Sequence, residues 1–167
     1  MAASLDVKLS DFVPRAIIRV FSTMMSLKLE ALDSPSDANL QGERVVGSVG
    51  FAGAATGMVY FQVTDVFARI MTASMLGRKL QDINGADEVN DAIGELSNMI
   101  GGNLKSCLSD SGFPCALSIP SITRGSSFNI QTRNGAWCER FAFQYQEHHV
   151  LVEISVRVNS TEGGING

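Results

Sequence analysis

The stretch DAIGELSNMIGGNLKSC, residues 91–107, has the residue spacing of an amphipathic helix. At about 100° per residue, one side of such a helix is apolar and should face the core. This apolar stripe consists of Val89, Ile93, Leu96, Ile100, Leu104 and Cys107. The opposite side carries polar or small residues, namely Asp91, Glu95, Asn98, Gly102 and Lys105. The pattern predicts one long helix over roughly residues 87–109.

Glycines interrupt this predicted helix near its polar side. Gly94, Gly101 and Gly102 fall within nine residues, although each interior glycine costs roughly 1 kcal/mol relative to alanine. Two explanations remain open. Small residues beside Glu95 and Asn98 would let a ligand or another backbone approach the helix closely. Alternatively, and for Gly101 equally well, the helix packs closely against another helix or a sheet.

Glu95 and Asn98 lie one helical turn apart, so their side chains project next to each other. The amide of Asn98 can donate and accept hydrogen bonds, and it can therefore orient a water molecule without titrating. The carboxylate of Glu95 can hold a cation, most simply a lysine of a partner protein. A polar face is also common on surface helices that have no special function, and the pattern alone leaves that alternative open.

Other reactive groups do not form a recognisable site. His148 and His149 are adjacent in a predicted strand and should point to opposite faces, so they are expected to be surface or edge-strand histidines. The sequence contains no phosphate-binding glycine loop, no metal-ligand spacing and no local Ser/His/Asp signature. The three cysteines show no CxxC spacing and are expected to be free thiols, with Cys107 buried.

The overall composition indicates a single folded domain. Hydrophobic residues make up 45% and charged residues 18% of the 167 residues, which is enough for a packed core. The net charge of −4 and the absence of a Lys/Arg cluster argue against nucleic-acid binding. Because no signal peptide and no apolar run of ~20 residues is present, we expect a soluble cytoplasmic protein without a membrane segment.

Local signals predict the remaining elements. Ser10 can cap a first helix that has Pro14 near its start. This helix is apolar on two sides, which indicates that it is buried either between a sheet and another helix or at a subunit contact. Thr64 or Asp65 should begin another helix, which Gly77 should end. A loop is expected over 33–43. Strands are expected at 45–51, 57–63, 116–119, 126–132, 137–146 and 148–158.

The element order suggests an internal duplication, because a helix followed by strands occurs twice. The segments VFSTMM (20–25) and ELSNMI (95–100) align with a serine and a methionine in common. In the first segment Val20 and Thr23 stand at the positions of Glu95 and Asn98. Only the second half therefore carries the polar pair.

The pattern Asp91-x3-Glu95-x2-Asn98, followed by Pro120, resembles the signature of the CheC/CheX/FliY family of chemotaxis phosphatases. The segments DAIGELSNMIGGNLKSCL and LSIPSITRG are most similar to the CheX members of this family. FSTM in the first helix, GFAGAATGMVYF and LVEISV occur in the family's order, so the resemblance covers about residues 10–158.

This resemblance implies an α+β fold, a CheC-like α/β sandwich with internal pseudo-duplication, in which helices pack on a mostly antiparallel sheet. We expect an N-terminal extension over 1–9, a single domain over 10–158 and a disordered tail over 159–167. CheX members are typically homodimers with one site in each subunit, and the single polar pair of this chain fits that arrangement.

The resemblance also implies a function, which is hydrolysis of the aspartyl phosphate of a CheY-type response regulator. Glu95 and Asn98 match the family's catalytic positions, and Asp91 and Pro120 match flanking positions. Gly102 is expected at the docking surface. No cofactor or metal is expected in this chain, because Mg²⁺ belongs to the phosphorylated regulator. The alternative is a non-catalytic module of the same fold that binds the regulator or serves in an assembly.

Overall fold

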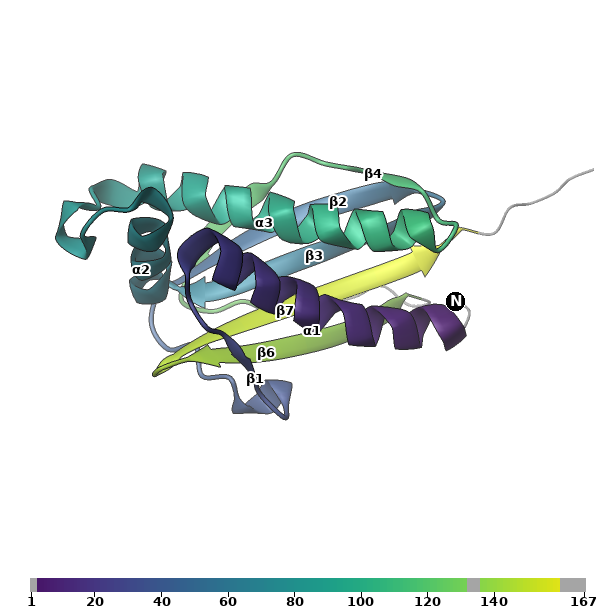
Figure 1. Ribbon diagram of the computed structural model, residues 1–167, viewed down its shortest axis with the longest axis horizontal. Coiled ribbons are helices and arrows are strands. Elements are labelled where there is room, and N and C mark those ends of the chain that lie inside the picture. Colours follow the sequence, from purple (N-terminus) through teal and green to yellow (C-terminus); the bar gives the residue numbers. More distant parts are fainter. Residues whose placement is uncertain (1–2, 132–135, 160–167) are drawn as a thin grey trace, which may run out of the picture.

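The computed structural model describes residues 3–131 and 136–159 (Figure 1). Its helices are α1 (Ala3–Met25), α2 (Asp65–Leu76) and α3 (Gly85–Asp110), with short 3-10 turns η1 (Pro35–Asp37) and η2 (Leu80–Asp82). Its strands are β1 (Glu30–Ala31), β2 (Arg44–Gly53), β3 (Ala55–Thr64), β4 (Cys115–Leu117), β5 (Ser121–Gly125), β6 (Trp137–Tyr145) and β7 (His148–Val158).

The strands form one antiparallel sheet in the order β1-β6-β7-β3-β2-β4, with β5 also paired to β2. The helices α1 and α3 run side by side over one face of this sheet (Figure 1). α3 covers the β2–β3 hairpin, and α1 crosses over β7 and β6, so each helix covers the hairpin of the other half. The structure therefore has the predicted α+β fold with helices on an antiparallel sheet.

The first helix begins at Ala3, so the prediction of an extension over residues 1–9 is wrong for residues 3–9. Leu5 and Leu9 continue the apolar stripe of α1 toward the N-terminus and are buried. Burial of two leucines contributes roughly 3–6 kcal/mol, which offsets the ~3 kcal/mol cost of Pro14 inside the helix. Residues 3–9 belong to the domain.

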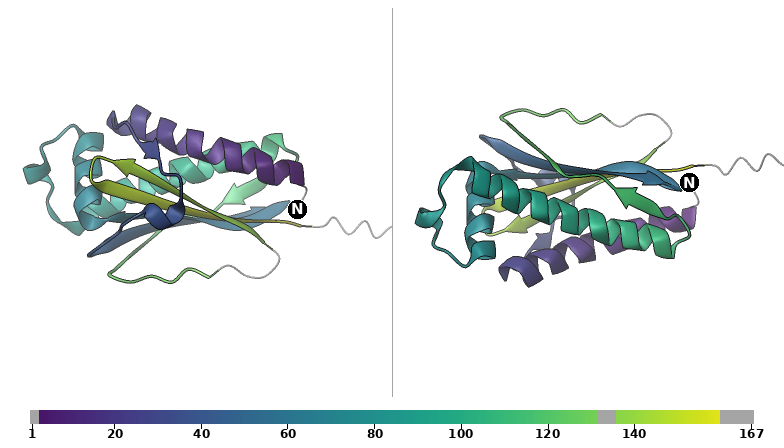
Figure 2. Two further views of the ribbon diagram at one scale, coloured as in Figure 1. Left: turned by 90° about the horizontal axis from the view of Figure 1, so that it is seen from below. Right: turned by 90° about the horizontal axis from the view of Figure 1, so that it is seen from above.

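The predicted strand over 126–132 is also wrong for residues 126–131, and residue 132 lies outside the described residues. Residues 121–125 form β5 instead, and residues 126–131 have no strand structure. They run past the helix-free face of the sheet, opposite α1 and α3 (Figure 2). Phe128, one of the apolar residues on which the strand prediction rested, instead packs its ring against Gly125. The two-residue strand β1 was not predicted, since so short a segment carries no periodicity.

Other predictions about the chain are confirmed. The Thr64 hydroxyl accepts a hydrogen bond from Phe67 N at 3.2 Å at the start of α2, and Gly77 ends that helix with a left-handed φ of 62°. Cys107 is buried, and burial raises the pKa of its thiol. Cys107, Cys115 and Cys138 all lie in the described residues, and none of them is in a disulfide.

The end of the chain is described only as far as Asn159. The Asn159 side chain donates a hydrogen bond of 2.6 Å to the carbonyl of Gly53, so this residue is anchored to the β2–β3 turn. The remainder of the predicted tail, 160–167, lies outside the described residues. In the parts of the chain that the structure describes, no helix combines the length and apolar character needed to span a bilayer.

Candidate active site

The orientation of α3 is the one that its sequence predicts. Every residue of the apolar stripe is at most 4% exposed; the stripe comprises Val89, Ile93, Leu96, Ile100, Leu104 and Cys107. Asp91 and Glu95 are exposed on the opposite side, and Asn98 and Gly102 are partly exposed there. The helix therefore presents its four predicted site residues on one solvent-facing surface.

The adjacent glycines Gly101 and Gly102 lie in different surroundings. A Cβ atom at Gly101 would lie 3.1 Å from Val49 Cγ1, tighter than an ordinary contact, and 3.6 Å from Leu117 Cδ2. Gly101 thus allows the helix to pack closely on the sheet. A Cβ atom at Gly102 would meet nothing within 4 Å. The sequence left two explanations open, close packing and room for a partner to approach. Close packing explains Gly101, and room for a partner explains Gly102, which leaves free space beside Asn98.

A second close contact fixes the height of α3 above the sheet. A Cβ atom at Gly47 in β2 would overlap the Ser97 hydroxyl, so only glycine fits beneath this serine. Ser97 is 1% exposed, and its hydroxyl donates a hydrogen bond of 2.7 Å to the carbonyl of Ile93. The residue next to Asn98 is therefore held firmly against the sheet, which limits how far the Asn98 backbone can move.

The segment between β4 and β5 lies next to α3 on the side of the helix that carries Gly94 and Asn98. Pro120 Cγ lies 3.8 Å from where a Cβ of Gly94 would be, which places the proline one turn before Asn98. The segment is tied to the sheet by Ser118, whose backbone N–H donates to Gly50 O at 2.8 Å. Ile119 is 88% exposed beside it. The structure thus brings Pro120 to the side of the predicted site.

Arg124 of β5 joins the elements that surround α3. Its Nη1 donates to Asp65 Oδ1 at 2.7 Å, and its Nε donates to Asn90 Oδ1 at 2.9 Å. Burial alone would raise the pKa of Asp65, but hydrogen bonds from Arg124 and Arg69 outweigh it and lower that pKa. Ionised Asp65 therefore stabilises this junction above about pH 4, and the contribution is lost as the pH falls through its lowered pKa.

A groove runs along the Glu95 side of the helix, between α3 and the end of α2. Its volume is about 330 Å³. It is lined by Met75, Leu76, Glu88, Asp91, Ala92 and Glu95. Sequence reasoning did not identify this groove or Arg124, because both depend on contacts between residues distant in the chain, for which the sequence offers no local signal.

The two acidic residues of the predicted motif are unengaged. Within the described residues, Asp91 and Glu95 form no hydrogen bond or ion pair with another side chain, and neither does Asn98. Glu88 is different, because it forms an ion pair with Arg78 and accepts a hydrogen bond of 2.9 Å from Asn84 N. These two donors lower the pKa of Glu88, with Arg78 contributing most.

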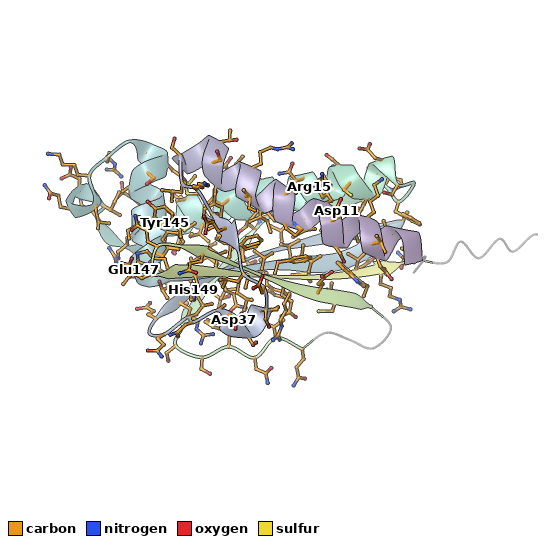
Figure 3. All side chains as sticks on the ribbon, turned by 60° about the horizontal axis from the view of Figure 1, so that its bottom comes forward. Asp11, Arg15, Asp37, Tyr145, Glu147 and His149 are labelled. Atoms are coloured by element: carbon orange, nitrogen blue, oxygen red, sulfur yellow. The ribbon has the colours of Figure 1, made fainter. Side chains whose placement is uncertain are left out.

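The histidines take no part in this site. His148 stacks on the Phe67 ring with centroids 4.8 Å apart, and His149 Nδ1 accepts a hydrogen bond from Asn39 N at 2.6 Å. Figure 3 shows His149 close to Tyr145 and Glu147 at the β6–β7 turn. The two rings have separate partners, as expected for opposite faces of a strand. Among the described residues, no group of three or more His, Cys, Asp or Glu side chains could hold a metal ion.

One family model matches this chain, and several solved structures share its fold. The family model described as chemotaxis phosphatase CheX matches residues 45–144. CheX from Vibrio vulnificus has a similar fold, with a TM-score of 0.74 at 25% identity over 88% of this chain and 95% of that chain. A CheC-like superfamily protein from Shewanella sp. PV-4 also has a similar fold. Its TM-score is 0.74 at 24% identity, over 90% of this chain and 98% of that chain.

A chain of the CheX–CheY–BeF3–Mg²⁺ complex from Borrelia burgdorferi gives a TM-score of 0.70 at 19% identity over 89% of this chain and 97% of that chain. No curated protein sequence matches. The family match covers more than half of the chain and includes Glu95 and Asn98 on α3 and Pro120 beside it. The chain therefore belongs to the CheX family of chemotaxis phosphatases.

Proposed function

We propose that this protein hydrolyses the aspartyl phosphate of a CheY-type receiver domain. The observation that carries the proposal is the open face of α3, where Asn98 and Glu95 have no partner among the described residues and Gly102 leaves free space beside them. The B. burgdorferi relative, solved as a complex with CheY, BeF3 and Mg²⁺, supports a receiver as the substrate.

In this mechanism the protein contributes position rather than a nucleophile. Asn98 enters the receiver's active site, and its amide orients a water molecule in line with the phosphoryl group. Glu95 pairs with a lysine of the receiver and sets the register of docking. The Mg²⁺ of the receiver neutralises charge on the phosphoryl group, as in other phosphoryl transfers. This chain then needs no metal or cofactor of its own.

A phosphate-release assay tests the proposal against the alternative of a binding or assembly module. A phosphorylated CheY-type receiver should lose phosphate faster when the protein is added in substoichiometric amounts. If the protein binds the receiver and leaves its rate of dephosphorylation unchanged, the module alternative is correct. The net charge of −4 provides no general attraction to acidic receivers, so local contacts must carry the docking.

Replacing Glu95 with alanine should weaken the complex without removing the water-orienting group. The lost charge-assisted contact is worth roughly 1.5–3 kcal/mol, so the KM for the phosphorylated receiver should rise about ten- to hundredfold. Glu95→Gln keeps the shape and loses the charge, and it should give an intermediate KM. Steady-state kinetics measure both. An unchanged KM in Glu95→Ala would show that Glu95 makes no docking contact.

We also propose that the protein is a homodimer whose sheet continues across a two-fold axis. β4 and β5 have β2 as their sheet neighbour in the described residues, which leaves an edge available for pairing. The strongly exposed Ile119 lies next to this edge. Light scattering at micromolar concentration should give a mass near twice 17.9 kDa. A monomeric mass would contradict the dimer.

A further inference from the structure

The groove beside Glu95 is large enough to accept side chains of another molecule. Its volume of about 330 Å³ is roughly ten times the ~30 Å³ share of a water molecule in the liquid. Met75, Leu76 and Ala92 give it an apolar lining along one side. The groove is therefore a site for apolar contact and not only a hydrated gap between helices.

Leu76 is the exposed part of this apolar lining. It is the last residue of α2 and is 51% exposed. Gly77 then ends the helix in a left-handed conformation, and about half of Leu76 stays accessible to solvent. An uncovered leucine next to an unengaged carboxylate is the arrangement found at the margin of a protein interface, where apolar and charged contacts lie together.

The charges at the groove are unbalanced. Glu88 is neutralised by its ion pair with Arg78, whereas Asp91 and Glu95 have no ion-pair partner within the described residues. Both carboxylates line the same groove. A complementary surface must therefore offer an apolar side chain together with more than one positive charge, or one positive charge shared between the two carboxylates.

We propose that this groove is a second docking contact for the receiver, in which an apolar side chain of the receiver packs on Leu76 and Met75 while a cationic side chain pairs with Asp91. The proposal rests on the function proposed above. The occupant is the receiver because Glu95 lines the groove and also belongs to the Asn98 face, so a protein docked over Asn98 lies against both. The groove would then distinguish receivers by the residues that flank their active site.

Two closely matched leucines allow a direct test. Leu76→Ser should raise the KM for the phosphorylated receiver about tenfold, the order expected for the loss of one well-packed leucine contact, and leave kcat unchanged. Leu80→Ser is the control, because Leu80 is 52% exposed and lies outside the groove lining. It should behave as the wild type. Leu76→Met keeps an apolar side chain at this position and should therefore give a KM for the receiver close to that of the wild type. Equal KM values for Leu76→Ser and the wild type would overturn the groove proposal.

The charge is tested separately by Asp91→Asn, with Asp87→Asn one turn earlier as the control. Asp87 is exposed and does not line the groove. Asp91→Asn should raise KM severalfold and weaken the dependence of KM on salt, whereas Asp87→Asn should change neither. If both variants shift KM equally, the effect is general electrostatics, and the specific pairing with Asp91 is wrong.

Binding measurements separate this proposal from the proposed function. A BeF3-activated receiver should bind the wild type and bind Leu76→Ser about tenfold more weakly. If the wild type binds this receiver but never accelerates phosphate release, the phosphatase function fails and the weaker binding of Leu76→Ser still supports the groove. If Leu76→Ser instead changes the oligomeric mass with receiver binding intact, the groove belongs to a contact between copies of this chain and the proposal is overturned.

Discussion

Replacing Asn98 with alanine should slow dephosphorylation of the receiver about a hundredfold or more, the scale observed when one well-placed hydrogen-bonding group is removed from an active site. The alanine side chain cannot hold the attacking water, while the docking contacts around it stay in place. The loss should therefore fall on kcat, with KM for the phosphorylated receiver nearly unchanged. Single-turnover phosphate release with saturating protein measures the chemical step directly.

The fold should tolerate this change. Asn98 is partly exposed and has no hydrogen-bond partner among the described residues, so its removal leaves no buried group unsatisfied. Alanine also has the better helix propensity, by up to about 0.7 kcal/mol. The free energy of unfolding should stay the same or rise slightly, and a denaturant titration measures it.

Asn103→Ala is the matched control for Asn98→Ala. Asn103 lies on the same helix but on the side that faces α1, where it lines a small cavity with Phe12 and Val13. The same chemical change at this position should leave the rate of phosphate release unaltered. If Asn98→Ala retains near-normal activity with a verified phosphorylated receiver, the catalytic assignment is wrong and the polar face of α3 is an ordinary solvent-exposed surface.

Helical periodicity was sufficient to predict the orientation of α3. The burial of Ile93, Leu96 and Ile100 follows from their spacing, and the position of Glu95 and Asn98 on the exposed side follows from the same rule. The chemical role given to the pair did not come from periodicity. It came from the resemblance to a family, which also singled out Pro120, a residue whose proximity to Gly94 no local pattern could indicate.

The errors of sequence reasoning have a common physical origin in tertiary contacts. The start of α1 was predicted too far along the chain, because a proline such as Pro14 is typical of the first turn of a helix. In the structure, burial of Leu5 and Leu9 stabilises further turns on the N-terminal side of Pro14. Arg124 and Leu76 acquire their environment only when β5 and α2 come to lie beside α3. Propensity and spacing describe one element at a time, and they carry no information about such contacts.

A bulky residue at Gly102 should prevent docking while the fold survives. A Cβ atom at this position meets nothing within 4 Å, so Gly102→Phe places its ring in the space next to Asn98 without disturbing the core. The helix itself gains, because glycine costs roughly 1 kcal/mol relative to alanine in a helix interior. We expect binding of a BeF3-activated receiver to weaken by about a hundredfold or more, since a ring that cannot be accommodated separates the two surfaces over the whole contact. Calorimetric or fluorescence titration measures this loss.

The neighbouring glycine gives the opposite result and makes the prediction specific. Gly101→Ala places a methyl group 3.1 Å from Val49 Cγ1. This overpacking should lower the free energy of unfolding by about 1–3 kcal/mol. The folded fraction should bind the receiver with nearly the affinity of the wild type. Ser22→Phe, on the exposed side of α1, controls for the general effect of a surface phenylalanine and should leave binding intact. Gly102→Ala should fall between the wild type and Gly102→Phe in affinity. Tight binding of the receiver to folded Gly102→Phe would mean that the partner does not approach this part of α3, and the site would then have to lie on another surface of the molecule.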